Sequence, residues 1–193
     1  NLYGAALSHW AWGDERAAGA TAIHAYNPDP EQNGWESTHS VVQIVTDDRP
    51  FLVDSLSMAI NAHGLMIHRI IHPVLEVERD ERHRITAVGD QSADSGQPEA
   101  WIHLEVDRQS NATQLKALKA AIADALNDVE AAVADWQPMC EQAQAALEGL
   151  RAHPPNIDSA ERDEVEAFIE WLLDDHFTFL GYRFYTLNRH NDE

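Results

Sequence analysis

The amino-acid sequence predicts an α+β fold in which an antiparallel sheet carries two helices on one face. Three observations lead to this prediction: residues 44–80 have the pattern strand, turn, helix, strand; residues 101–107 alternate like a strand; and an amphipathic helix begins after residue 111. The full order of predicted elements matches a split βαββαβ unit. The sheet is therefore the candidate functional surface.

The first strand and helix follow from the spacing of apolar residues. The mostly apolar run from Ser40 to Thr46 is typical of a buried strand. Pro50 suits a first helical turn, and Gly64 is expected to end the helix. Between them, apolar residues recur at helical spacing at Leu52, Leu56, Ala59 and Ile60. A second strand is predicted from Met66 to Glu78.

The next elements are a hairpin arm and a strand. Residues Arg84 to Val88 are expected to pair back on the second strand, and the composition of residues 89–98, rich in Gly, Ser, Asp and Pro, indicates an exposed loop. The segment from Trp101 to Asp107 is predicted to be a half-buried strand. One face would carry Ile102, Leu104 and Val106, and the other Trp101, His103 and Glu105.

Helices and one late strand complete the prediction. Capping boxes begin at Asn111 and Asp158, each followed three residues later by Gln or Glu, and each opens a helix. Pro138 is expected to break or kink the first of these helices, after which a helical piece continues to about Leu150. A strand rich in Phe and Tyr is predicted from Phe177 to Leu187.

These elements divide the chain into three parts. Residues 1–38 are a lead-in segment packed on the core, and residues 39–152 form the main α+β domain. Residues 156–193 add a helix and a strand, which either complete the sheet or lead into a further domain. The start without Met and the charged end are expected of a piece of a longer chain.

Composition narrows the classes of partner and the compartment. The chain has 193 residues and a net charge of -20, so a nucleic-acid backbone or an anionic membrane would be repelled from most of its surface. Cys140 is the single cysteine, which favours a reducing, cytoplasmic setting. The sequence contains neither an apolar run long enough to span a membrane nor a signal peptide at its start.

Two motifs carry a resemblance to known families. The tripeptide Asp48-Arg49-Pro50, between the first strand and the first helix, resembles the turn of ACT domains, ferredoxin-like regulatory modules in which this turn helps to hold an amino acid, often across a dimer interface. The usual family turn ends in Gly, where this chain has Phe51. Two longer stretches, 35–74 and 171–182, resemble the N-terminal region of the large NAD-specific glutamate dehydrogenases of bacteria.

The resemblance implies a parent enzyme that oxidises L-glutamate to 2-oxoglutarate and ammonia with NAD, its catalytic and NAD-binding domains lying downstream. We expect no catalytic residue and no cofactor in the present chain, because its glycines do not form the Gly-x-Gly-x-x-Gly pattern that cradles a dinucleotide. The implied partners are that downstream catalytic domain, further copies of the chain in a homo-oligomer, and an amino-acid effector.

The turn is the first candidate site. Asp48, Arg49, Pro50, Phe51 and Leu52 would line an effector pocket or an interface, with Arg49 able to grip a carboxylate through its planar guanidinium group. The structural alternative is that the carboxylates around the turn cap the first backbone N–H groups of the helix. Phe51 in place of Gly favours that alternative, because it removes the close backbone approach that a ligand would use.

Three histidines are the second candidate site. His68 and His72 would share a strand face, and a neighbouring strand carries His103, so the three imidazoles can converge on a metal ion or act as a pH sensor. The alternative is a polar sheet surface that is solvated or faces a partner subunit. Cysteine or an organised carboxylate cluster that would supply a fourth ligand is lacking.

Three functional hypotheses follow. The first is a regulatory domain that changes the activity of a distant dehydrogenase by binding a small molecule. The second is a structural module that assembles subunits and binds no ligand. The third, a self-contained enzyme, is disfavoured because the sequence lacks a nucleophile–base pair, a cofactor loop and a metal cluster.

Overall fold

The computed structural model of the chain describes residues 2–89 and 96–185. The chain divides into two compact units, residues 1–130 and residues 131–193. The first unit contains the sheet, and the second contains helices. The lead-in segment belongs to the first unit, because it contributes one strand of the sheet and a helix that packs on it.

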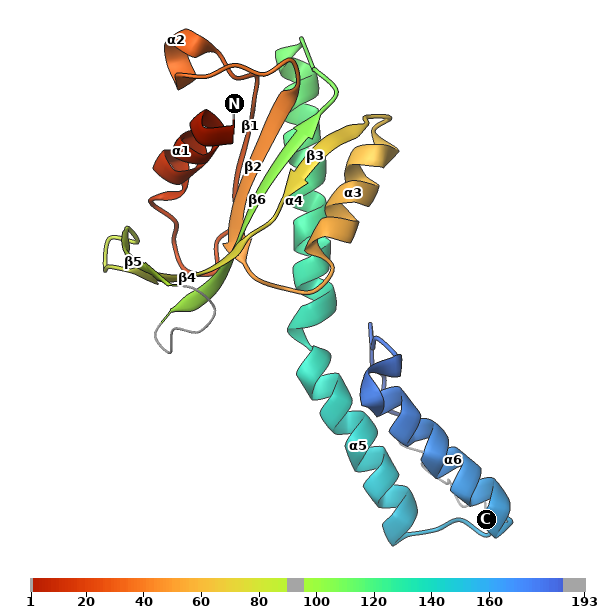
Figure 1. The fold of residues 1–193 in the computed structure, drawn as a ribbon. Coiled ribbons are helices and arrows are strands. Elements are labelled where there is room, and N and C mark those ends of the chain that lie inside the picture. The colour runs from red at the N-terminus through yellow and green to blue at the C-terminus, as the bar shows by residue number, and fades with distance from the viewer. Residues whose placement is uncertain (1, 90–95, 186–193) are drawn as a thin grey trace, which may run out of the picture. The chain divides into compact units, whose positions relative to one another are not determined.

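The first unit is built on one antiparallel sheet (Figure 1). Its described strands follow the order β1-β2-β6-β4-β5, and β3 also pairs with β6. Every pairing between them is antiparallel, as predicted. The strands are β1 (Ala22–Tyr26), β2 (Ser40–Asp47), β3 (Ile67–Ile71), β4 (Val74–Arg79), β5 (Ile85–Gly89) and β6 (Gln97–Val106).

Two helices cover one face of this sheet, as the βαββαβ pattern requires. They are α3 (Leu52–Ala62) and α4 (Ala112–Ala134). The apolar face of α4 is buried at Leu118, Ile122, Leu126 and Val129, and it packs in one core with apolar residues of β2, β6 and α3. The predicted cap is also present, because Asn111 Oδ1 accepts a hydrogen bond from Thr113 N at 2.8 Å.

The opposite face of the sheet is covered as well, which the sequence did not predict. Helix α1 (Leu2–Gly13) lies on this side (Figure 1). Gln43 of β2 donates a hydrogen bond to the carbonyl of Ala5 at 3.2 Å, and the ring of His9 lies 5.1 Å from the ring of Trp101. The prediction of a half-buried strand at Trp101–Asp107 is therefore wrong for its second face, because residues 101–106 are all buried.

The helix start and the long second strand both differ in detail from the prediction. Pro50 precedes α3, because Phe51 takes the left-handed conformation with φ 68° and ψ 5° before the helix begins at Leu52. A Pro followed by a residue of positive φ is the pattern of a type II turn. The strand predicted from Met66 to Glu78 is interrupted at Pro73, which has no N–H for the ladder, so β3 and β4 pair with successive parts of β6.

The second unit contains α5 (Trp136–Ala152), α6 (Ser159–Trp171) and the π-helical turn η1 (Leu172–His176). The break between α4 and α5 falls at Asp135, close to the predicted break at Pro138. Arg151 of α5 pairs with Glu166 at 2.9 Å and also with Glu170, both of α6.

The predicted strand from Phe177 to Leu187 is not formed. Residues 177–185 have no strand assignment, and 186–187 lie outside the described residues. The sheet edge beside β2 is taken by β1 of the lead-in through five paired positions. A short helix, α2 (Pro30–Asn33), follows β1. None of the helices in the described part of the chain is both long and apolar enough to cross a membrane.

Candidate functional site

A cavity of about 490 Å³ lies where β2 runs into the predicted site turn. Its walls come from the segment after α1, the end of β2, the end of β4 with the turn that follows, and the start of β6. The lining residues are Arg16, Ala18, Gly19, Asp47, Asp48, Val77, Arg79, Asp80, His83, Gln97, Pro98 and Glu99.

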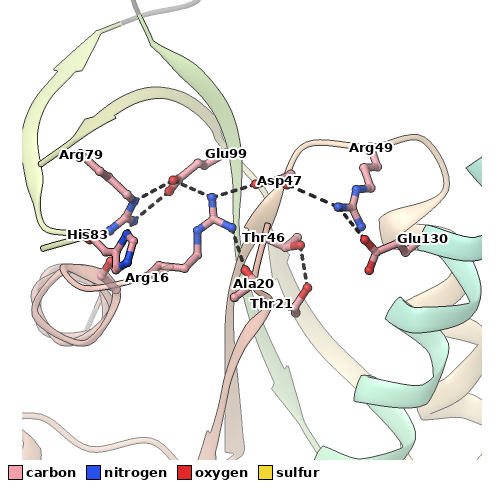
Figure 2. Close-up of polar contacts among 11 residues, drawn as sticks. Arg16, Ala20, Thr21, Thr46, Asp47, Arg49, Arg79, His83, Glu99 and Glu130 are labelled. Atoms are coloured by element: carbon pink, nitrogen blue, oxygen red, sulfur yellow. Dashed lines mark hydrogen bonds and ion pairs between the residues drawn. The ribbon is translucent and has the colours of Figure 1, made fainter. Parts of the chain in front are cut away.

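Glu99 is the centre of the polar wall (Figure 2). Its side chain is 2% exposed, and its Oε1 accepts hydrogen bonds from Arg16 Nη2 at 2.7 Å and from Arg79 Nε at 2.8 Å. Arg79 Nη2 donates to Oε2 at 3.0 Å, so this guanidinium group holds the carboxylate in a bidentate pair. A buried charge is tolerated in an apolar strand only with such partners.

The electrostatics of Glu99 follow from this geometry. Burial alone would raise the pKa of its carboxyl group, but the hydrogen bonds and charges of Arg79 and Arg16 outweigh burial and hold the pKa below its usual value. Glu99 is therefore ionised throughout the neutral range and anchors the two arginines.

Both arginines donate most of their hydrogen bonds to groups of the protein itself. Arg79 Nη1 donates to the carbonyl oxygens of Asp14 and His83, and its Nη2 donates to the carbonyl of Gly13. Arg16 donates to the carbonyl of Ala20 and to Asp47. These bonds tie the segment after α1 to the sheet. The remaining Arg16 nitrogen, Nε, is buried and without a partner among the described residues.

Asp48 contributes a carboxylate that lines the cavity. Its backbone N–H donates to the carbonyl of Pro98 at 2.9 Å, which fixes its position, while its exposed side chain makes no hydrogen bond or ion pair in the described part of the chain. Asp80, by contrast, already accepts bonds from the N–H groups of Arg82 and Arg84. With four carboxylates and two occupied guanidinium groups in its walls, the cavity suits a cationic group such as an ammonium.

The predicted site turn is only partly at this cavity. Asp48 lines it, whereas Arg49 turns toward α4, where its Nη2 lies 3.3 Å from Glu130 and 3.4 Å from Asp47 (Figure 2). Pro50, Phe51 and Leu52 are not among the lining residues. Arg49 is thus placed to link the cavity wall to α4, and its grip on a ligand carboxylate stays a prediction.

The structural alternative for the turn has limited support. Phe51 occupies the N-cap position of α3 and makes no side-chain hydrogen bond there. Asp54 lies in the first turn, where its charge suits the positive end of the helix dipole. The carboxylate of Asp47 instead binds Arg16 at 2.8 Å.

The three predicted histidines do not form a cluster. His68 lies at a β-bulge between Ile67 and Arg69, which breaks the alternation of β3; it contacts Asp107 at 2.8 Å and stacks on His39 at 4.1 Å. His103 is buried against Trp35, and His72 lies after the end of β3. Within the residues described, we find no group of three or more His, Cys, Asp or Glu side chains that could hold a metal ion.

A layer of imidazole and indole rings lies between α1 and the sheet, and the sequence did not predict it. Burial, together with the nearby His103, lowers the pKa of His9 from 6.5 to about 4. Burial also lowers the pKa values of His24 and His103, although Glu105 acts against burial at His103. These rings are neutral packing groups at pH 7.

Arg16, Arg79 and Glu99 are the site residues that sequence reasoning missed. One signal was available: Glu99 directly precedes the apolar alternation of β6, and a carboxylate in such a strand needs a cationic partner. The identity of that partner could not be read, because Arg16 and Glu99 are 83 positions apart.

Comparisons with known proteins show which sequences this chain is similar to. The family model described as "Glutamate dehydrogenase, ACT1 domain" matches residues 1–122. The NAD-specific glutamate dehydrogenase of Halomonas elongata is 41% identical over 186 residues, which cover 94% of this chain and 12% of that protein. The Pseudomonas aeruginosa protein of the same name is 39% identical, with 94% of this chain and 11% of its own length covered. The Mycobacterium tuberculosis protein is 25% identical, with 91% and 11% covered. The chain thus spans only 11–12% of the length of these curated relatives.

Proposed function

Because the chain belongs to the glutamate dehydrogenase ACT1 domain family, we propose that it is the non-catalytic N-terminal regulatory domain of an NAD-dependent glutamate dehydrogenase and binds an amino-acid effector. The parent enzyme would convert L-glutamate, NAD and water to 2-oxoglutarate, ammonia and NADH in domains outside this chain. The domain would act on that reaction from a distance.

The cavity beside Asp48 is the single observation that carries the proposal. It is large enough for a small polar molecule, lies next to the turn that resembles the ACT motif, and presents an unpaired carboxylate to it. Because the guanidinium groups of Arg16 and Arg79 are largely buried and already hold Glu99, Asp47 and backbone carbonyls, the ammonium group of the effector is what the site would recognise.

A link to α4 supports a regulatory role. Asp47 lines the cavity and shares its two oxygens between Arg16 and Arg49, and Arg49 also contacts Glu130 of α4. A ligand ammonium that binds Asp47 would compete with Arg49 for this carboxylate and so favour a state in which the Arg49–Asp47 pair is open and Arg49 is held by Glu130 of α4 alone. Such a difference in affinity between two states is what regulation requires.

A thermal-shift screen of the 193-residue chain tests this proposal. Each amino acid is compared with its decarboxylated amine and its 2-oxo acid, because a ligand at 100 times its Kd adds about 2.7 kcal/mol to stability. We expect a shift from compounds that carry the ammonium group and from no 2-oxo acid. Asp48→Asn should remove the shift, and Asp54→Asn, which lies away from the cavity lining, should retain it. A screen without any shift would sink the sensor proposal.

An assembly module is the second candidate function, and one observation favours it. Strand β3 pairs with β6 on one side only in the described sheet, and Met66, Ile70 and Ile71 along it are exposed. An open edge with apolar side chains is a site where a strand of a second copy can add. Light scattering at several concentrations should then show a dimer that Ile70→Lys disrupts and Met58→Lys, an exposed change on α3, does not. A monomer at all concentrations would count against assembly through this edge.

A further inference from the structure

Residues 177–185 have the composition of a strand, but they pair with none of the described strands. Phe177 has φ −143° and ψ 141°, which is extended backbone. None of the described strands pairs with this segment, and the backbone hydrogen bonds found outside helices and strands do not involve residues 178–185. An extended backbone with unpaired N–H and C=O groups is a template for a partner strand.

Both faces of the segment carry large apolar side chains, and Arg183 is its one charged residue. In strand alternation, Leu180, Tyr182 and Phe184 fall on one side, and Phe177, Phe179 and Tyr185 fall on the other. Five of these side chains are exposed by half or more, with Phe184 at 76% and Tyr185 at 77%. Folded proteins expose single large apolar side chains but not a run of this length. A strand with two apolar faces is expected inside a sheet that is covered on both sides.

The helix before the segment extends the same apolar surface. α6 has no buried residue, and its Phe168 and Trp171 are exposed and stacked at 6.2 Å. Trp171 in turn stacks on His176 at 4.9 Å, directly before the segment begins. Within the second unit, Leu180, Gly181 and Tyr182 line a cavity with Pro138, Met139 and Gln142 of α5, and Tyr182 Oη donates a hydrogen bond to Gln142 at 3.2 Å.

We propose that residues 177–185 are a strand of a β-sheet that belongs to the polypeptide C-terminal to this chain, with Phe168 and Trp171 packed on that sheet. The inference rests on the proposed function in one respect, namely that the chain is part of a much longer enzyme. The relatives match 91–94% of this chain but only 11–12% of their own length, so most of their polypeptide is available as a tethered partner.

Two alternatives for the partner are less suitable. In the sheet of the first unit, β1 fills the place beside β2, and the open edge of β3 does not pair with the segment in the described structure. A second copy would bring another net charge of -20 and would have to associate against this repulsion, whereas a tethered sheet pays no such concentration-dependent cost.

Hydrogen exchange on the full-length enzyme and on the 193-residue chain tests the inference. We expect the amides of residues 178–185 to exchange rapidly in the 193-residue chain and at least about 100-fold more slowly in the full-length enzyme. Strand β6 serves as the internal reference, because it should be protected in both. Rapid exchange of residues 178–185 in the full-length enzyme would overturn the inference. Protection of the 193-residue chain that rises with its concentration would also overturn it, in favour of a second copy.

Matched substitutions separate the interface from general folding defects. Leu180→Asp, at a side chain that is 70% exposed here, should abolish the protection of residues 178–185 in the full-length enzyme and leave β6 protected. Met58→Asp, at a side chain that is 72% exposed on α3, should change neither. Because this readout uses no effector, a failed ligand screen with intact protection refutes the sensor and not the interface, and the reverse result refutes only the interface.

Discussion

Acid should loosen α1 from the sheet through His9. This side chain is 7% exposed, its ring lies 5.1 Å from that of Trp101, and burial lowers its pKa from 6.5 to about 4. The unfolded chain therefore binds a proton at higher pH than the folded chain does. The contribution of neutral His9 to stability is complete above pH 6.5, falls as the pH drops below 6.5, and is lost near pH 4.

The magnitude follows from the two pKa values. The difference between 6.5 and about 4 corresponds to about 3 kcal/mol of unfolding free energy over the whole range. Between pH 7 and pH 5 the same linkage gives a loss of about 2 kcal/mol. The variant His9→Phe keeps an aromatic ring against Trp101 but cannot bind a proton, so it should lack this part of the pH dependence.

The assay is urea unfolding followed by tryptophan fluorescence at pH 7 and pH 5. Wild type should lose about 2 kcal/mol more than His9→Phe between the two pH values. The control His63→Gln, at an exposed histidine after α3, should behave like wild type. Equal pH dependence of wild type and His9→Phe would refute the reasoning that burial of this imidazole controls acid stability.

Three further predictions concern stability at neutral pH, each measured by urea unfolding. Glu99→Gln should lower the free energy of unfolding by about 3 kcal/mol or more, because it leaves two guanidinium groups without their buried carboxylate. Glu130→Gln, at a side chain that is 50% exposed, should lower it by less than about 1 kcal/mol. Equal losses would show that the network does not depend on Glu99. Phe51→Gly should be more stable than Phe51→Ala by about 1 kcal/mol, because both lose the ring but only Ala must adopt φ 68°; the reverse order would contradict the left-handed turn. Gly13→Ala should destabilise the protein by about 1–3 kcal/mol, because the new Cβ would lie 2.5 Å from a buried indole ring. Gly149→Ala has open space around the new Cβ and should stabilise α5 by up to about 1 kcal/mol. Similar effects of the two substitutions would rule out close packing of α1.

The sequence predicted those elements whose signal is local. The strand before Asp48, the helix that ends at Gly64 and the cap at Asn111 each depend on apolar spacing or on a residue that favours one backbone conformation, and the structure confirms them. The hairpin arm was also confirmed, as β5. These features need no knowledge of distant contacts.

The features that the sequence did not predict depend on distant partners. The second face of β6 looked polar because His103 and Glu105 lie on it, and only the packing of α1 makes that face buried. The segment after Phe177 has the composition of a strand, but none of the described strands pairs with it. The Arg16–Glu99 pair joins residues from the lead-in and from β6, and a single sequence does not reveal such a pairing.

The candidate site also combines a feature that the local sequence predicted with one that depends on distant contacts. The turn at Asp48 was found from its motif, and the structure places a cavity next to it. Arg49 faces Glu130 rather than the cavity because of the position in which α4 packs. The spacing of residues around the turn does not reveal that position.

The rate of NAD-dependent glutamate oxidation by the full-length enzyme, measured with and without an effector that carries an ammonium group, tests the central claim most directly. We predict that the effector changes this rate in the wild-type enzyme and in Asp54→Asn, and that Asp48→Asn abolishes the response. A wild-type rate that no such compound changes, or an unaltered response in Asp48→Asn, would contradict a regulatory site at this cavity.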